Sequence, residues 1–148
     1  MDAKWGDRAN QMGTIIEDIL APTFRPLARE HFRFEAIEDF MMRRSRRSST
    51  LGVESEFDTL VVGPDAVILG EAKSSPSREY ADAFADEVRT FFDFFAESRG
   101  RRLIPIFGSW AIPDAVVERL TVRRIYATRR GVETMELAHA AALAADAG

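Results

Sequence analysis

The chain has no cysteine and only two histidines among its 148 residues. Without cysteine it can form neither disulfides nor thiolate metal sites. With His31 and His139 as its only imidazoles, we expect neither a histidine-rich metal site nor a Ser-His-Asp hydrolase. The sequence also shows no signal peptide and no apolar stretch long enough to span a membrane. We therefore expect a cytoplasmic protein with no membrane partner.

Lysine is almost absent as well. Of the 20 basic residues only Lys4 and Lys73 are lysine, and all the others are arginine. Lysine carries a compact, rotatable ammonium group, whereas the arginine group is planar and always charged. A lysine kept at position 73 of a chain that otherwise uses arginine suggests a chemical role. The net charge of −4 argues against a surface coated with basic residues for DNA.

Length and composition are those of one globular domain. The chain is 46% hydrophobic and 30% charged, and its length suffices for one core but not for two. We expect a single domain over residues 1–148. Its alanine-rich end, residues 138–148, is expected to be a frayed helical tail. No internal repeat or linker divides the chain.

The stretch 56–73 is the most informative part of the sequence. It consists of two apolar runs separated by a Gly-Pro-Asp sequence, in which Pro64 and Asp65 suit the centre of a tight turn. This pattern predicts a β-hairpin. If Pro64 and Asp65 form the loop, Val62 faces Val67 and the pairing of the two strands follows by counting back.

Continued along the strands, this register places Asp58 opposite Glu71 and Glu56 opposite Lys73, all four on one face. A bulge at the turn would change the register. The remaining hairpin positions are apolar on both faces, as in central strands covered by helices. Two carboxylates about 5 Å apart repel by about 3 kcal/mol. Lys73 can neutralise only one of them, so a shared proton, another cation or a divalent metal is needed. A hard cation bound through oxygen atoms accounts for the arrangement best.

The other segments predict alternating helices and strands. We expect helices at about 7–20, 75–98 and 110–120, and strands at about 40–46, 53–62, 103–108, 123–128 and 132–137. Pro105 argues against a central place for its strand. The long helix presents an apolar stripe that we expect in the core, formed by Tyr80, Phe84, Val88, Phe91, Phe92 and Phe95. The fold class is α/β, a three-layer sandwich with a central mixed β-sheet flanked by helices, in the order αβββαβ followed by a short helix and C-terminal strands.

Asp58, twelve intervening residues and then Glu71-Ala72-Lys73 form a pattern that resembles the signature of the PD-(D/E)XK nuclease superfamily. This superfamily has the restriction-endonuclease-like fold and includes restriction enzymes and archaeal Holliday-junction resolvases. The order of the expected elements resembles that family over most of the chain. The chain departs from the signature at Phe57, where the pattern has proline.

The resemblance implies metal-dependent hydrolysis of phosphodiester bonds, above all in DNA. Asp58 and Glu71, with the backbone carbonyl of Ala72, would hold Mg²⁺ or Mn²⁺. Lys73 would orient the attacking water or assist its deprotonation. A glutamate on the first helix often reaches the metal in this family, and Glu17 occupies such a place, although an acid at the flank of a helix can equally be solvated.

Two further sets of residues complete the hypothesis. Glu56 could extend the acidic site, but in the expected register it pairs with Lys73. The run of four arginines between the first two strands, at a hairpin tip, is either solvated or a segment that contacts phosphates, and we favour the second for Arg43, Arg44, Arg46 and Arg47. Many enzymes of this family act as dimers, so a homodimer is among the expected assemblies.

Two other functions remain open. A nuclease-fold domain can be catalytically inactive and serve as a nucleic-acid-binding or protein-interaction module. Loss of Asp58, Glu71 or Lys73 would favour that alternative, and all three are present. The acids and the lysine could instead form a structural ion-pair cluster. In a hairpin that is apolar on both faces such a cluster is costly unless every charge is paired.

Overall fold

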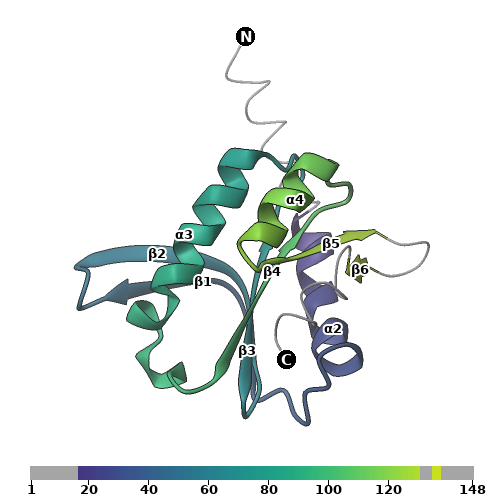
Figure 1. The fold of residues 1–148 in the computed structure, drawn as a ribbon. Helices are drawn as coiled ribbons and strands as arrows, with labels where there is room; N and C mark the ends of the chain where they lie inside the picture. Colours follow the sequence, from purple (N-terminus) through teal and green to yellow (C-terminus); the bar gives the residue numbers. More distant parts are fainter. Residues whose placement is uncertain (1–16, 131–134, 138–148) are drawn as a thin grey trace.

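A twisted β-sheet forms the centre of the computed structural model, which describes residues 17–130 and 135–137 (Figure 1). Within these residues the sheet has six strands in the order β1-β2-β3-β4-β5-β6. Their bounds are Asp39–Ser48 for β1, Val53–Val62 for β2, Ala66–Ala72 for β3, Arg102–Gly108 for β4, Tyr126–Arg130 for β5 and Met135–Leu137 for β6. The first three strands are antiparallel, β3, β4 and β5 are parallel, and β6 is antiparallel to β5. The sheet is therefore mixed, as predicted.

Helices cover both faces of the sheet (Figure 1). On one face, α3 and α4 enclose an aromatic core, while α2 covers a smaller core on the other. The helices are α2 (Phe24–Glu30), α3 (Arg78–Phe94) and α4 (Asp114–Val122), with short 3₁₀ turns at Ala21–Thr23 and Ala96–Ser98. This arrangement confirms the predicted three-layer α/β sandwich and its order of elements.

The ends of the chain limit two predictions. Residues 17–20 are helical and lead into the turn at Ala21–Thr23, close to the expected helix end near Leu20. The rest of the helix expected at 7–20 and the tail at 138–148 lie outside the described residues.

The β2–β3 hairpin has the predicted register over its paired length. Val62 pairs with Val67 and Thr59 with Gly70, and the Gly63 N–H donates to the Ala66 carbonyl at 2.8 Å across the turn. The pairing ends at Thr59. The extension of the register to Asp58–Glu71 and Glu56–Lys73 is therefore wrong, because β2 separates from β3 at Asp58.

The separation begins at a local irregularity in β2. Its pairing with β1 passes from Met42–Thr59 to Arg44–Phe57, so that Arg43 and Asp58 stay unpaired, and Arg43 has a φ of 53°. A non-glycine residue at positive φ is uncommon and strained. Beyond this point, β1 and β2 continue as a two-stranded ribbon that extends past the sheet (Figure 1).

The irregularity also changes which face Phe57 occupies. Simple alternation placed Phe57 on the face opposite Leu60, but Phe57 is fully buried in the same core cluster as Leu60. Its ring lies edge-on to those of Phe94 and Phe95, with centroids 5.3 and 5.0 Å apart. Phe57 therefore anchors the diverging part of β2 to the α3 layer.

Two further expectations need correction. Pro105 lies in a central strand, between β3 and β5. The Arg102 N–H donates to the Asp65 carbonyl in the β2–β3 turn, and the Ser109 N–H donates to the Thr128 carbonyl of β5. The backbone N–H groups of even-numbered residues in β4 therefore point toward β3, and those of odd-numbered residues, including position 105, point toward β5. Pairing with β5 starts only at Ile106, so the missing N–H of Pro105 costs no ladder bond.

The second correction concerns the apolar stripe of α3. Ser77 caps the helix by accepting a bond from the Tyr80 N–H at 3.2 Å, which agrees with the predicted start. Tyr80 itself is 45% exposed and does not belong to the core. Phe84, Phe91 and Phe95 are buried as predicted.

Phe57→Ala should lower the free energy of unfolding by about 3–5 kcal/mol, because it leaves a cavity among three phenylalanine rings. Val53→Ala on the same strand is the matched control, since Val53 is 51% exposed, and it should change stability by less than about 0.5 kcal/mol. Urea titrations of the three proteins measure both effects. Equal midpoints for Phe57→Ala and Val53→Ala would contradict the anchoring role.

Candidate functional site

The separation of β2 from β3 creates the place where the predicted residues meet. One Asp58 carboxylate oxygen, Oδ2, accepts a bond from the Ala72 N–H at 3.3 Å, so a side chain of β2 reaches the end of β3. Glu71 is 9% exposed, and its Oε1 lies 3.3 Å from Lys73 Nζ. Asp58, Glu71 and Lys73 are therefore gathered at one end of the hairpin, through side-chain contacts rather than cross-strand pairing.

Lys73 is held as a cation. Its ammonium nitrogen lies 4.7 Å from the centre of the Tyr80 ring, a cation–π contact that adds to the ion pair with Glu71. Burial alone would lower the pKa of Lys73, but the negative charges of Glu71, Asp58 and Glu17 outweigh burial, and the pKa is raised. Lys73 therefore keeps its proton at neutral pH and acts as a hydrogen-bond donor.

The carboxyl group of Glu71 lies in the opposite situation. Burial, together with the charges of Asp58 and Glu87, raises its pKa to about 9 although Lys73 opposes the shift. One ammonium group thus does not offset the negative charge gathered here. Burial is the largest cause of the raised Glu71 pKa, and repulsion by Asp58 adds to it.

Glu17 lies at the same centre. It lines a small hollow of about 20 Å³ together with Asp58, Ala72 and Arg43. Burial and the charge of Asp58 raise the pKa of Glu17, while Lys73 opposes that shift. The structure therefore brings the first-helix glutamate next to Asp58, which is where the family resemblance expects it.

Glu87 of α3 is a site residue that the sequence interpretation missed. Burial and then Asp58 raise its pKa to about 7, while Lys73 lowers it, so its carboxyl group belongs to the same electrostatic centre. The signal was present in the sequence: Glu87 falls three residues after Phe84 and four before Phe91, both buried. An acid at that spacing points toward the core rather than toward solvent.

Glu56 lies away from this group. It is exposed on β2, opposite Ser45 of β1, and the ion pair of Lys73 is formed with Glu71 instead. The prediction that Glu56 pairs with Lys73 is therefore corrected.

The arginine run is a strand rather than a hairpin tip, because β1 extends to Ser48. Its arginines differ in their surroundings. Arg43 forms an ion pair with Asp18, and Arg46 pairs with Glu97 at 2.7 Å while stacking over the Phe95 ring.

Arg44 and Arg47 are exposed, and they lie on opposite faces of the ribbon. Arg47 is paired in register with Glu54, next to which Glu56 adds a second acid on the same face. The four arginines therefore form no single basic patch. Arg43 is exposed as well, but it is engaged by Asp18.

The centre offers a divalent cation only a partial set of protein ligands. In the described part of the chain, no group of three or more histidine, cysteine, aspartate or glutamate residues is placed to hold a metal ion. Mg²⁺ usually takes one or two protein carboxylates and completes its shell with water and substrate phosphate. Asp58 and Glu71 supply two carboxylates whose mutual repulsion such an ion would relieve.

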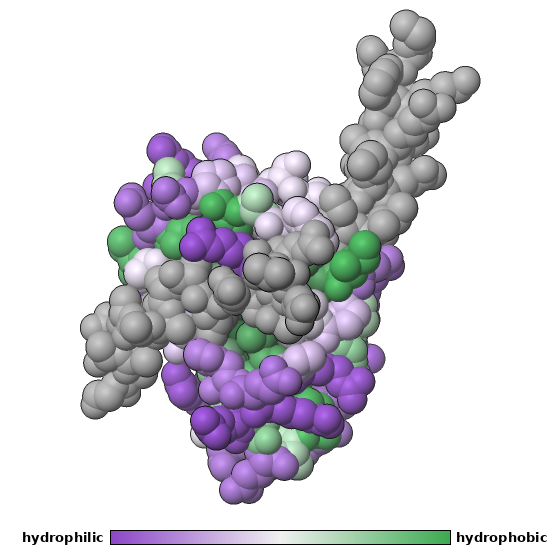
Figure 2. Space-filling model, turned by 90° about the vertical axis from the view of Figure 1, so that its right-hand side faces the viewer, coloured by the Kyte–Doolittle hydropathy of each residue, from purple (hydrophilic) through white to green (hydrophobic). Residues whose placement is uncertain are grey.

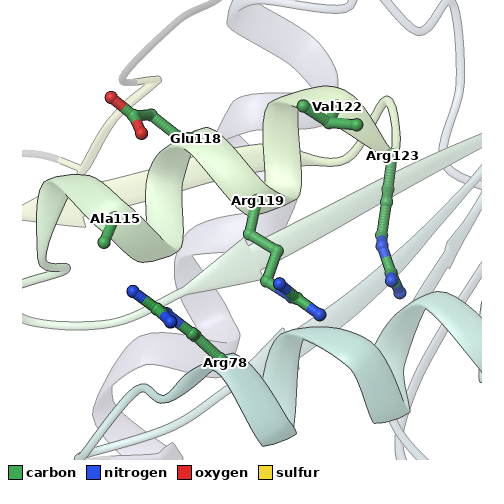
Figure 3. A pocket seen from close by; sticks show the side chains of 6 residues that line it. All are labelled: Arg78, Ala115, Glu118, Arg119, Val122 and Arg123. Carbon is green, nitrogen blue, oxygen red and sulfur yellow. The ribbon is translucent and has the colours of Figure 1, made fainter.

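A larger hollow, of about 460 Å³, lies between α3 and α4 and contains none of these residues. Figure 3 shows Arg78 at the start of α3 and Arg119 and Arg123 extending from α4. Arg119 holds Asp82 through two bonds of 2.7 and 2.8 Å, and Arg123 lies 3.1 Å from the same carboxylate. These contacts join the two helices, so we interpret the hollow as structural.

The surface on the α2 side is mostly hydrophilic, with several separate apolar areas (Figure 2). None of the helices in the described ranges has the length and apolar character needed to cross a membrane.

Without metal, the stability of the protein should fall as the pH rises from 5 to 8. The unfolded chain loses the Glu71 proton near pH 4.5, whereas the folded protein keeps it up to about pH 9, so the folded state binds more protons in between. One such group lowers the free energy of unfolding by about 3 kcal/mol between pH 4.5 and pH 7. Urea titrations in EDTA at several pH values measure the slope.

Glu71→Gln removes the titrating group, so its stability should change less with pH than that of the wild type. Glu54→Gln, at an exposed acid of β2, is the matched control and should keep the wild-type slope. Equal slopes for the wild type and Glu71→Gln would show that Glu71 is not held protonated.

Comparison with known proteins shows similarity of fold. No known protein family matches the sequence, and no curated protein is similar to it. The protein VC1899 from Vibrio cholerae matches with a TM-score of 0.54 and 14% identity, over 75% of this chain and 28% of that chain. The small subunit R.BspD6I2 of the heterodimeric restriction endonuclease R.BspD6I matches with a TM-score of 0.43 and 15% identity, over 71% of this chain and 54% of that chain. The chain thus spans just over a quarter of the first structure and just over half of the second.

Proposed function

We propose that this chain is a metal-dependent nuclease of the PD-(D/E)XK type that hydrolyses phosphodiester bonds in DNA. One observation carries the proposal. Four acids, Glu17, Asp58, Glu71 and Glu87, act on one another around the single ammonium group of Lys73, where β2 leaves β3. A divalent cation would offset this negative charge and could in turn bind an oxygen of a phosphodiester.

Mg²⁺ or Mn²⁺ would be held by Asp58 and Glu71, with the Ala72 carbonyl as a further oxygen ligand and Glu17 beside them. When bound, the ion would neutralise charge on the scissile phosphate and lower the pKa of a coordinated water. Asp58 is pre-positioned for this role, because its bond from the Ala72 N–H fixes the carboxylate against the end of β3.

Lys73 would bind and orient the substrate. Its raised pKa keeps the ammonium charged, and Glu71 and the Tyr80 ring fix where it lies. A charged ammonium can donate a hydrogen bond to a non-bridging phosphate oxygen, where negative charge develops as the phosphorus is attacked. It cannot accept a proton from water, so this arrangement favours the orienting role for Lys73 over the role of a base.

Contacts to the DNA backbone would come from the β1–β2 ribbon. A two-stranded ribbon has the width that a groove of duplex DNA admits, and exposed arginines bind phosphates without regard to sequence. Arg44 and Arg47 are exposed and form no ion pair within the described part of the chain. Arg43 and Arg46 would first have to release Asp18 and Glu97.

The proposal predicts that Mg²⁺ raises the melting temperature and that Asp58→Asn abolishes this increase. Only the folded protein presents the ionised acids as a site, so the ion stabilises it by mass action. Asp58→Asn should also abolish cleavage while leaving the metal-free protein as stable as the wild type or slightly more stable, because one repelling charge is gone. Thermal unfolding and cleavage of several DNA and RNA forms, in Mg²⁺, Mn²⁺ and EDTA, measure both effects.

Asp65→Asn is the matched control, because Asp65 is exposed at the far end of the same hairpin. It should keep both the metal response and cleavage. If the metal response is present without cleavage of any substrate, the domain is a binding module. If millimolar Mg²⁺ leaves the melting temperature unchanged and Asp58→Asn strongly destabilises the protein, the acids and Lys73 form a structural cluster.

A further inference from the structure

Two glycines interrupt the apolar face that the sheet turns toward α2. On this face β3 carries Ile68 and then Gly70, while β4 carries Ile104, Ile106 and then Gly108. Because side chains alternate along a strand, each glycine stands where the pattern would place another large side chain. The glycines therefore leave a notch in this face, near the end of β3 at which the candidate site lies.

The ring of Phe24 fills this notch. A Cβ atom on Gly70 would lie 2.8 Å from Cε2 and 2.9 Å from Cδ2 of the ring, and a Cβ on Gly108 would lie 3.4 Å from Cζ. Carbon atoms that are not bonded prefer separations of about 3.5–4.0 Å. No side chain fits at position 70 while the ring, which is 1% exposed, stays where it is. The lack of a side chain at Gly70 thus sets how closely the helix of Phe24 approaches the sheet.

The helix that carries Phe24 also carries Glu17. Helical residues from position 17 lead through a 3₁₀ turn into α2, and the Phe24 N–H donates to the Ala21 carbonyl across that turn. Ala21, Phe24 and Ala28 are buried at spacings of three and four residues. Glu17 lies four residues before Ala21, so it continues the same face of the helix.

The contacts of this face lead from the notch to the candidate site. Glu17 and Ala21 line the small hollow that also contains Asp58 and Ala72. Ala72 is two residues after Gly70 and therefore lies on the same face of β3. The notch and the hollow are thus neighbours on one strand, and one helix reaches both.

We propose that Phe24 is a positioning residue of the candidate centre, whose ring, seated on Gly70 and Gly108, holds Glu17 beside Asp58. The consequence for metal binding rests on the proposed nuclease function. Two carboxylates that approach each other repel, so packing elsewhere on the helix must hold Glu17 in place. The Phe24 ring supplies this packing without taking part in the centre itself.

The test changes the notch and leaves the acids in place. Gly70→Ala adds a methyl group against the Phe24 ring. Gly63→Ala is the matched control, because a Cβ on Gly63 would lie 2.6 Å from the Phe34 ring at the other end of the same hairpin. Phe24→Leu leaves the notch partly empty, and its combination with Gly70→Ala restores room for the added methyl group.

The position of Glu17 can be measured without metal or substrate. The chain has no cysteine, so Glu17→Cys introduces a single thiol. The rate at which iodoacetamide alkylates this thiol in EDTA reports its surroundings, because burial and neighbouring carboxylates disfavour the reactive thiolate. Ile19→Cys supplies the reference thiol, since Ile19 is 55% exposed.

We expect Gly70→Ala and Phe24→Leu each to accelerate alkylation at position 17 at least about threefold, because a displaced helix exposes the thiol. The combined variant should return the rate to within about twofold of the rate in the wild-type background. Gly63→Ala should leave it unchanged, and the rate at position 19 should be the same in every background. If Gly70→Ala does not fold, Phe24→Leu alone decides the result.

Mn²⁺ titration by calorimetry tests the consequence for the centre. With Glu17 present, Gly70→Ala should weaken Mn²⁺ binding about tenfold, the scale on which residues that orient ligands act. Glu17→Gln should weaken binding as much by itself and should add no further loss in the Gly70→Ala background. Gly63→Ala should bind Mn²⁺ as the wild type does. Thermal unfolding in EDTA shows which variants are folded at the temperature of the measurement.

Three results overturn the inference. Equal alkylation rates at position 17 in the wild-type, Gly70→Ala and Phe24→Leu backgrounds show that the ring does not place Glu17. An equal acceleration by Gly63→Ala shows a general loosening of the fold. Unchanged Mn²⁺ affinity in both Gly70→Ala and Glu17→Gln shows that the seat has no effect on the centre. If the wild type neither binds Mn²⁺ nor cleaves DNA, the proposed function fails, and the alkylation rates still decide whether Phe24 places Glu17.

Discussion

The gathering of buried acids around one ammonium group is the constraint on which the rest of the structure depends. Glu71 and Glu87 are held where burial and neighbouring charges oppose their ionisation, and among the described residues Lys73 is the cation that counters this effect. Repulsion between carboxylates tends to open a hairpin, because like charges that face each other across two strands destabilise the pairing of those strands. The surrounding fold must therefore supply enough packing to hold these groups together.

That packing comes from the aromatic layer under α3. Phe57 directly precedes Asp58, is fully buried, and meets the rings of Phe91, Phe94 and Phe95. Its rotation onto this layer coincides with the unpaired Arg43 and Asp58 and with the positive φ of Arg43. Burial of one phenylalanine side chain stabilises the fold by about 1.5–3 kcal/mol. A strained backbone residue such as Arg43 costs about 1–3 kcal/mol. The burial of Phe57 therefore offsets the strain only when its ring is well packed.

Local pattern was sufficient to predict the sheet, the turn and the identity of Asp58, Glu71 and Lys73 as neighbours. The register was correct from Val62 to Thr59 because period-two alternation and turn geometry act over a few residues. It failed at Asp58, where a tertiary contact, the burial of Phe57, overrides alternation. Glu87 was missed because acids of a helix are usually solvated, and here only its spacing between Phe84 and Phe91 indicates otherwise. The arginine run was misplaced at a turn because charge density alone does not distinguish a loop from an exposed ribbon.

The balance of charge argues for a binding centre over a structural ion-pair cluster. A structural cluster lowers the free energy of the folded state only if its charges are matched and its hydrogen bonds are complete. Here Lys73 and Glu71 form one pair, while Asp58, Glu17 and Glu87 add further acids. Among the described residues, the other cation that acts on this group is Arg43. It acts on Glu17 and is itself bound to Asp18. The buried Glu87 oxygen is also unpartnered among the described residues. A fold selected for stability alone would replace such groups with apolar side chains, so their retention at the end of a well-packed hairpin is best explained by a ligand that completes them.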